Sequence, residues 1–362
     1  MKPSKMPRHA LGSLLTLNEG PWRWAIGVQA GIAMGLPIAL FTLGGHQSFG
    51  FIASLGAFTA LYGAKLSRSG RLRILPLALI GLIAASSLGV LASPHEWLTN
   101  LTLVTVAALG CVLTLGTPLG PPGPIMFVLV AAVSAQLAAP LNHGGAGFEK
   151  MAVPALVALG GLIAYLVIIS PLALPSVRRR ELAASDTPDE ATPGKARFDS
   201  TAKAITIRVV IAVAIASFFN RPLGAYRSYW VIVTAVAVLQ SSPTRRLTNV
   251  RAFQRVIGTI LGVGIFAVIA MSQPAAAALV AIVVVLQFAV EVVVARNYGL
   301  ALLFITPLAL TIYMAGRTVD PFVMIRGRIS DTLLGASIAL AVFWSGEWLR
   351  HRLKAAKGKI DG

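Results

Sequence analysis

The sequence predicts an all-α polytopic membrane protein with about 12 transmembrane helices, arranged as two parallel six-helix repeats. Two observations support this fold class. Of the 362 residues, 56% are hydrophobic and only 12% are charged, and the mean hydropathy is +0.78, whereas a soluble domain is typically about 25% charged. Basic residues also gather in alternate connections between the apolar stretches, as the positive-inside rule requires.

Twelve apolar stretches are candidates for membrane spans. A helix that crosses the bilayer needs roughly 20 mostly apolar residues, because the hydrocarbon core is about 30 Å thick and a helix rises about 1.5 Å per residue. The stretches at 47–64 and 228–242 are short and contain polar residues. The predicted spans are 23–44, 47–64, 74–93, 97–116, 122–140, 151–172, 202–220, 228–242, 255–272, 274–294, 298–314 and 327–349.

The positions of the 31 Lys and Arg residues predict the orientation. If the N-terminus is inside, most of them fall in cytoplasmic segments, such as 65–73, 178–203 and 350–362. We therefore expect a multi-pass protein of the bacterial cytoplasmic (inner) membrane with both termini cytoplasmic. This arrangement explains the formal net charge of +18 without nucleic acid, because the apolar stretches leave no room for soluble basic domains.

The polar segment 173–201 divides the chain into two halves. It mixes Pro, Ser, Thr and charges of both signs, which is typical of a flexible linker. Six spans in each half imply the same topology and hence parallel repeats. Matches at a fixed offset, such as Arg71 with Arg251, favour a duplication. The predicted organisation is a cytoplasmic segment 1–22, a first membrane repeat 23–172, a cytoplasmic linker 173–201, a second membrane repeat 202–349 and a basic cytoplasmic tail 350–362.

The second half contains the most informative motifs. Tyr229-Trp230 opens a short span, a basic loop follows, and Arg-x-x-Gly-Thr-x-x-Gly begins the next span at Arg255. This order resembles the fusaric acid resistance protein-like family of bacterial integral membrane transporters, over about 202–345. The substrate-path candidates at or near its motif positions are Arg208, Tyr229, Trp230, Thr234, Arg255, Thr259, Tyr298, Thr306, Arg328 and Asp331.

The resemblance implies a class of function and of substrate. Relatives of this family include exporters of aromatic carboxylic acids and, more distantly, plant malate-permeable anion channels of the aluminium-activated type. The resemblance therefore implies that this chain moves small organic anions across the membrane.

Charged residues within the spans are the first candidates for a substrate path, because a charge inside the bilayer costs about 2.5–3.5 kcal/mol on insertion scales and usually faces the bundle interior. Arg208 is expected either to attract an organic anion or to snorkel to the inner headgroups. Arg255 is expected to line a cytoplasmic vestibule or to serve topology and lipid contact. Glu291 is the proton-coupling candidate, with an ion pair to Arg296 or Arg208 as the alternative.

The remaining candidates also have two interpretations each. Asp331 follows Arg328 by three residues, so the two form either a local ion pair on one helical face or part of an outer gate. The aromatic and hydroxyl candidates form either an amphipathic route for a ring-bearing carboxylate or, for Tyr and Trp near a span end, interface anchors.

The sequence gives no support for an enzyme. It contains no GxxxxGK[ST] phosphate loop, no nucleophile elbow and no Cys/His ligand cluster, and its single cysteine, Cys111, rules out an intramolecular disulfide framework. We therefore predict no catalytic residue, no metal and no cofactor. The expected partners are small organic anions and membrane lipids, and a homo-oligomer stays open.

The function predicted from these observations is export of organic anions, in particular aromatic carboxylates, across the inner membrane. Movement is expected to be uniport or channel-like, or coupled to protons. The alternative is a membrane scaffold or lipid-interacting protein that transports nothing. A continuous polar path separates the two: if Arg208, Thr234, Thr306 and Asp331 all faced lipid or packed protein, the scaffold would be favoured.

Overall fold

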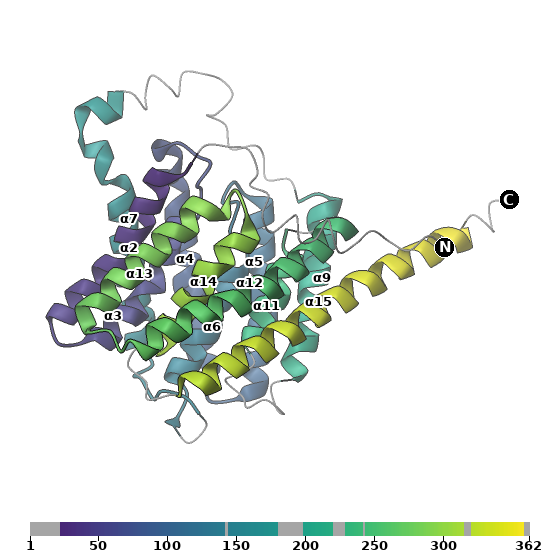
Figure 1. The fold of residues 1–362 in the computed structure, drawn as a ribbon. Coiled ribbons are helices and arrows are strands. Elements are labelled where there is room, and N and C mark those ends of the chain that lie inside the picture. Colours follow the sequence, from purple (N-terminus) through teal and green to yellow (C-terminus); the bar gives the residue numbers. More distant parts are fainter. Residues whose placement is uncertain are drawn as a thin grey trace.

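In a computed structural model of the chain, every described element is a helix (Figure 1). The structure describes residues 22–141, 144–179, 198–219, 229–241, 243–314 and 320–357. Residues 1–21 of the predicted N-terminal segment 1–22 and residues 180–197 of the predicted linker lie outside them. The helices in chain order are α2 (Trp24–Leu43), α3 (Gln47–Ser54), η1 (Gly56–Leu61), α4 (Arg68–Ala92), α5 (Glu96–Gly116), α6 (Ile125–Ala138), α7 (Ala152–Ile169), η3 (Ser170–Ala173), α9 (Ser200–Phe218), α11 (Tyr229–Leu239), α12 (Arg245–Met271), α13 (Ala276–Val294), α14 (Tyr298–Met314) and α15 (Pro321–Lys357).

Eight of these helical segments are long and apolar enough to cross a membrane: α2, α4, α5, α7 with η3, α9, α12, α13 and α15. The all-helical membrane fold is thereby confirmed. Four of the twelve predicted spans form shorter apolar helices instead, namely α3 with η1, α6, α11 and α14. The number of twelve spans therefore stays a prediction.

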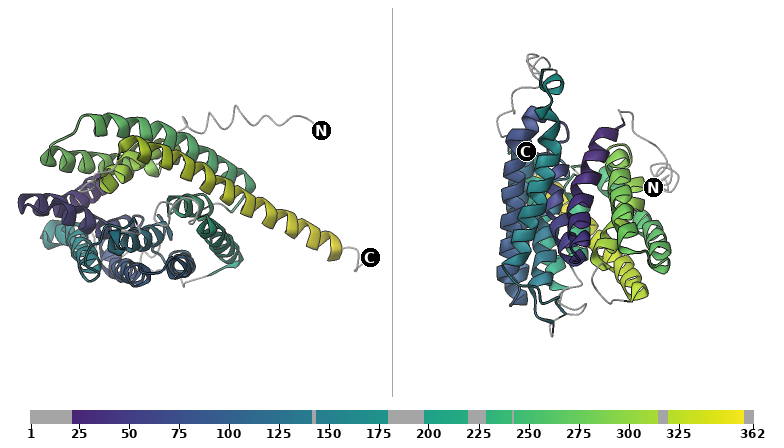
Figure 2. Two further views of the ribbon diagram at one scale, coloured as in Figure 1. Left: turned by 90° about the horizontal axis from the view of Figure 1, so that it is seen from below. Right: turned by 90° about the vertical axis from the view of Figure 1, so that its left-hand side faces the viewer.

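The short helices lie inside the bundle. Every residue of η1 and of α11 is buried, and so are most residues of α6. Viewed from below, α12 and α15 run along one side of the molecule, and α4, α5 and α7 run along the other (Figure 2). A helix wrapped by others satisfies its backbone internally and need not reach both headgroup layers, because protein rather than lipid surrounds its ends.

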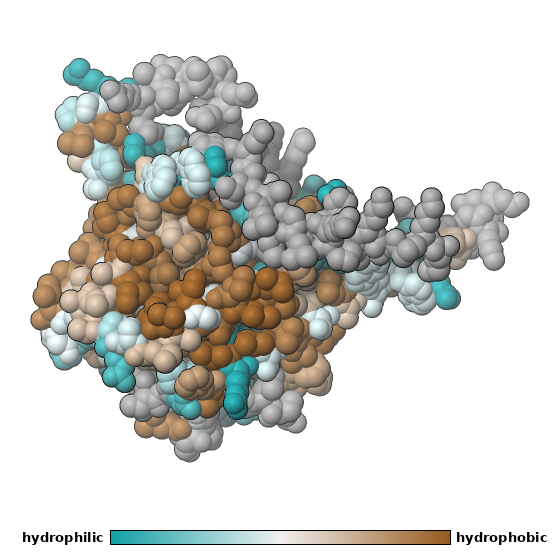
Figure 3. All heavy atoms as spheres, viewed as in Figure 1, coloured by the Kyte–Doolittle hydropathy of each residue, from teal (hydrophilic) through white to brown (hydrophobic). Residues whose placement is uncertain are grey.

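The long helices present apolar side chains outward. Val28, Ile32, Leu36 and Leu40 form an exposed stripe at four-residue spacing along α2, and hydrophobic residues cover the middle of the face in Figure 3. In water such a surface would be an aggregation liability, whereas in a bilayer it is the lipid-facing surface.

Three helices begin six or more residues earlier than predicted, and one of them is α15, which begins at Pro321 instead of residue 327. The predicted basic loop at 245–254 is the first part of α12, and α4 begins at Arg68 instead of residue 74. The side chains of Thr244 and Ser67 accept backbone hydrogen bonds at these starts, which is the usual N-cap interaction. Hydropathy marks where a helix enters the hydrocarbon, but capping and backbone hydrogen bonding decide where it begins. At the other end of the chain, α15 continues past the predicted limit at 349 and projects from the bundle (Figure 1).

Gly160 makes one of the closest helix contacts in the protein. A Cβ built at this position of α7 would lie 1.8 Å from the carbonyl oxygen of Ala53 in α3. We expect Gly160→Ala to destabilise the fold by about 1–3 kcal/mol, because the backbones must move apart. Thermal unfolding in detergent should show a lower midpoint. Gly264→Ala is the control, since nothing lies within 4 Å of its added Cβ; equal midpoints for both variants would contradict this packing.

Candidate functional site

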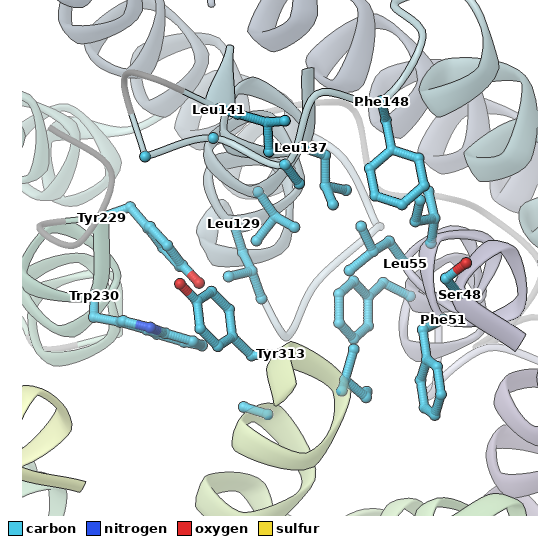
Figure 4. A pocket seen from close by; sticks show the side chains of 18 residues that line it. Ser48, Phe51, Leu55, Leu129, Leu137, Leu141, Phe148, Tyr229, Trp230 and Tyr313 are labelled. Atoms are coloured by element: carbon cyan, nitrogen blue, oxygen red, sulfur yellow. The ribbon is translucent and has the colours of Figure 1, made fainter. Parts of the chain in front are cut away.

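A cavity of about 480 Å³ lies among α3, η1, α6, α11 and α14. Its walls are mostly aromatic and aliphatic, and Figure 4 shows Tyr229, Trp230 and Tyr313 gathered on one side with Phe51 and Phe148 on the other. The ring centroids of Tyr229 and Trp230 are 4.7 Å apart. This volume is in the range of small-molecule sites, which are typically about 300–1,000 Å³ and mostly apolar. We call it the aromatic cavity.

A second cavity, of about 230 Å³, opens toward the end of the bundle where α2, α4 and α12 begin and α13 ends. We call this the basic end, because Arg23, Lys65 and Arg255 line the cavity there. The guanidinium Nη1 of Arg255 donates a hydrogen bond to the hydroxyl oxygen of Tyr298 (3.2 Å). Residues from α6, α13 and α14 make its remaining wall largely apolar. We call it the basic cavity.

The basic cavity also contains the one carboxylate predicted to couple to protons. Glu291 lines it and is buried, and its Oε1 accepts a hydrogen bond from Nε2 of Gln287, one turn earlier on α13 (3.3 Å). Of the two pairings predicted for Glu291, with Arg296 or with Arg208, the second is wrong, because Arg208 pairs with Glu347. The cations that act electrostatically on Glu291 are Arg23 and Arg71.

Four apolar residues line both cavities: Phe58 of η1, Leu129 of α6, and Ala309 and Ile312 of α14. The two cavities therefore meet at one place, which we call the neck. An apolar constriction between two cavities can act as a gate by excluding water. The three elements that form it belong to the four short apolar helical segments.

A third chamber, of about 70 Å³, lies beside the aromatic cavity. It shares Tyr229, Trp230 and Tyr313 with that cavity and is also lined by Arg328 and Asp331 of α15. The guanidinium carbon of Arg328 is 3.8 Å from the ring centroid of Trp230. Two further candidates from the sequence therefore lie next to the aromatic cavity.

The described interior carries more buried positive than negative charge. Its buried charged residues are Arg71, Arg208, Arg255, Glu291, Arg328 and Asp331. Charges in a low-dielectric interior are screened little, so this excess favours an anion over a cation in the adjoining cavities.

Arg208 occupies a structural position. Its Nη2 donates to Oε1 of Glu347 at 3.0 Å, and its guanidinium carbon lies 4.2 Å from the ring centroid of Phe343. Arg245 and Arg350 contact the same carboxylate. Arg208 does not line the three cavities described above, and it reaches α15 instead of lipid headgroups.

We expect Glu347→Gln to lower the thermal unfolding midpoint by several degrees. The pair is partly buried, with side-chain exposures of 8% and 21%, so the cost is smaller than the 3–5 kcal/mol of a fully buried pair. Arg208→Gln should give a similar decrease, and the double variant should cost less than the sum of the two. A double variant whose cost equals that sum would contradict the contact.

The three threonine candidates lie outside the described cavities. Thr234, Thr259 and Thr306 are buried, and none lines the described cavities. Thr234 packs against Gly335 of α15, and Thr306 packs against Gly262 of α12. Of the four residues that were to separate transporter from scaffold, only Asp331 lines a chamber. The two larger cavities are instead lined by other, mostly apolar residues, many of them from the short helices.

The aromatic candidates lie inside the protein. Tyr229 and Trp230 are only 4% and 9% exposed, so they are not interface anchors in this fold, and Tyr298 lines the basic cavity. Arg255 is 3% exposed and lines the same cavity.

Sequence reasoning missed the neck and one buried cation. Phe58, Leu129, Ala309 and Ile312 carry no chemical signal, since apolar residues are the norm in these stretches. Arg71 was assigned to a loop, but it is buried, and its Nη2 donates to the carbonyl oxygen of Ala60 (2.5 Å). The match of Arg71 with Arg251 between the two halves was the sequence feature that could have marked Arg71 as more than a loop residue.

Comparison with known proteins confirms the family resemblance. Residues 211–342 match the fusaric acid resistance protein-like family. The chain is 34% identical over 147 residues to the uncharacterized membrane protein YvaC of Bacillus subtilis (strain 168). The aligned region covers 41% of this chain and 22% of that protein. It is 33% identical over 143 residues to an uncharacterized protein of Haemophilus influenzae, covering 39% of this chain and 19% of the relative.

A third relative, the uncharacterized protein ORF2 of Neisseria gonorrhoeae, is 31% identical over 136 residues, which are 37% of this chain and 32% of that protein. The matched region thus spans between about a fifth and a third of the length of these curated relatives. No solved structure matches the chain.

Proposed function

We propose that this chain, whose residues 211–342 form a fusaric acid resistance protein-like domain, is a membrane transporter of small organic anions. The observation that carries the proposal is the pair of cavities that meet at the neck of Phe58, Leu129, Ala309 and Ile312. Together they form a route from the basic end toward the opposite end of the bundle.

The walls of the route favour an anion that carries a ring, and the proposed substrate class is therefore aromatic carboxylates. The basic cavity supplies Arg23, Lys65 and Arg255 in its wall, which would raise the local concentration of anions. The aromatic cavity beyond the neck offers Tyr229, Trp230 and several phenylalanines to a flat apolar ring.

The proposed direction is export across the inner membrane. By the positive-inside rule, the proposed orientation has the basic end and both termini in the cytoplasm. An inside-negative potential then favours outward movement of a monovalent anion by about 2.3 kcal/mol per 100 mV. A uniporter or channel-like mechanism is therefore sufficient, and coupling to protons through Glu291 is the second mechanism that the basic cavity would allow.

We also propose that the two halves are parallel repeats, each with six helices. Contacts between helices support this arrangement, because they recur in the same order. In the first half α2 packs on α3, α3 on α7, and α4 on α6; in the second half α9 packs on α11, α11 on α15, and α12 on α14. Each half also contributes its second and fifth helices to the route, and these are the four short apolar helical segments.

Close glycine contacts recur in the same places. Gly160 of α7 meets the backbone of Ala53 in α3, and Gly335 of α15 meets the backbone of Val231 in α11. Two halves that each supply two inner helices would complete the route within one chain.

Anion flux into proteoliposomes that contain the purified full chain tests this function. Benzoate, malate and chloride are compared under an imposed potential without a pH gradient. Potential-driven benzoate flux that exceeds malate and chloride flux is the expected result. Flux that appears only with a proton gradient, and is lost in Glu291→Gln, would favour coupling. No flux of any anion would contradict transport and favour the scaffold.

A further inference from the structure

Arg328 is the largest fully buried side chain of the described residues. It lies on α15, two turns after the start at Pro321, with 2% of its surface exposed. Its guanidinium lies over the ring of Trp230, 3.8 Å from the centroid. Such stacking holds the group at a fixed position but uses none of its N–H donors.

The donors of Arg328 are incompletely used. Its Nε and Nη1 atoms are buried and have no hydrogen-bond partner among the described residues. The other buried arginines outside the route make direct contacts through their Nη atoms: Arg208 donates to Glu347 and Arg71 to Ala60. An unsatisfied buried donor typically costs about 1–3 kcal/mol. Two such donors on one guanidinium therefore form a position where a hydrogen-bond acceptor of a ligand would be strongly bound.

One cation and one anion act on Arg328, so the group carries a net positive charge when Arg328 itself is counted. Arg255, Asp331, Tyr229 and Tyr298 are its electrostatic neighbours. Arg255 is the second arginine of this group, and both arginines have a buried Nε without a partner among the described residues. Tyr298 and Arg255 line the basic cavity, whereas Tyr229 lines the aromatic cavity. Arg328 is therefore electrostatically coupled to both sides of the neck.

We propose that Arg328, held by Trp230, is the site that binds the carboxylate group of the transported anion. The chamber of about 70 Å³ that Arg328 lines is of the size of a carboxylate rather than of a whole aromatic acid. The aromatic cavity, which shares Tyr229, Trp230 and Tyr313 with the chamber, takes the ring. The inference rests on the proposed function, and it assigns the discrimination of a charged from a neutral ligand to one residue.

Isothermal titration of the purified full chain with benzoate and with benzamide tests the assignment. Benzamide has the same ring and a similar shape but no charge. Arg328→Gln should weaken benzoate binding about tenfold or more, as expected when a charge-assisted hydrogen bond is removed, and should leave benzamide binding unchanged. Arg326→Gln is the matched control, because Arg326 is exposed on the same helix and loses the same charge.

A second variant distinguishes loss of the binding site from misfolding of the chain. Arg328→Lys keeps the buried charge but replaces the planar guanidinium, so benzoate binding should be weaker than in the wild type while the chain still folds. Equal benzoate affinity in Arg328→Gln and the wild type, or an equal loss in Arg326→Gln, would overturn the assignment, as would a wild-type chain that binds no benzoate. The flux measurement separates this failure from that of transport: benzoate flux that survives in Arg328→Gln with unchanged selectivity removes the site but keeps the transporter.

Discussion

Phe58→Ala should open the route. Phe58 lines both cavities and contributes the only aromatic ring of the neck, so its removal widens the constriction and lets water enter. A reduction of the barrier by about 1.4 kcal/mol raises a rate tenfold, and hydrating the neck should lower the cost of desolvating an ion by at least that amount. We therefore expect benzoate flux to rise at least about tenfold. We also expect the selectivity for benzoate over chloride to be lost.

Phe51→Ala is the matched control for the neck. Phe51 is buried and lines the aromatic cavity, but it does not line the basic cavity. The same substitution there should cost similar stability and change benzoate flux much less. If Phe51→Ala raises the flux as much as Phe58→Ala does, or if Phe58→Ala leaves flux and selectivity unchanged, the neck is not the barrier.

Arg255→Glu should nearly abolish anion flux. Arg255 is buried in the wall of the basic cavity and is bonded to Tyr298. Reversal of its charge places a negative group in the cavity that Glu291 also lines, and like charges at close range repel strongly in a low-dielectric interior. A loss of about 1.5–3 kcal/mol of charge-assisted interaction corresponds to a decrease of more than about tenfold in flux at low anion concentration.

Arg246→Glu is the control for the charge reversal. Arg246 is exposed near the start of the same helix, α12, so its substitution changes the net charge equally without entering the cavity. Flux through this variant should stay within about twofold of the wild type at about 0.15 M salt, where exposed charges are largely screened beyond about 8 Å. Equal losses in both variants would mean that net charge, rather than the basic cavity, attracts the anion.

Hydropathy predicted the helices well because desolvation of the backbone requires a helix wherever the chain is apolar. The span predicted at 298–314 coincides with α14, and the span predicted at 97–116 differs from α5 by one residue. The starts of α4 and α12 were missed because Arg and Lys are good helix formers, so a basic stretch next to a span need not be a loop.

The candidate site was only partly predictable. Arg255 and Glu291 were found because buried charge is rare in a membrane and usually functional. Thr234 and Thr306 were selected by motif, but the structure uses them where α11 and α14 pack against glycines. A single sequence does not say which face of an entirely apolar helix points into a cavity, since every face of α11 is hydrophobic and buried.

The residues of the neck could not be identified from the sequence either. Ala309 and Ile312 differ in no sequence property from the apolar residues around them, and only the arrangement of α6, η1 and α14 makes them a constriction. The aromatic pair Tyr229-Trp230 carried a signal, but burial was needed to distinguish a cavity wall from an interface anchor.

Chemical modification at the neck tests the central claim, that anions pass between the two cavities. The chain has one cysteine, Cys111, so Ala309→Cys in a Cys111→Ala background places the only thiol at the neck. Neither a negatively nor a positively charged methanethiosulfonate crosses the bilayer, so either must use the route. We predict that the negatively charged reagent modifies the thiol of Ala309→Cys faster, that benzoate slows this reaction, and that benzoate flux falls as mass spectrometry shows the adduct accumulating. Complete modification with unchanged flux would mean that anions take another path, and faster reaction with the positively charged reagent would contradict anion selectivity.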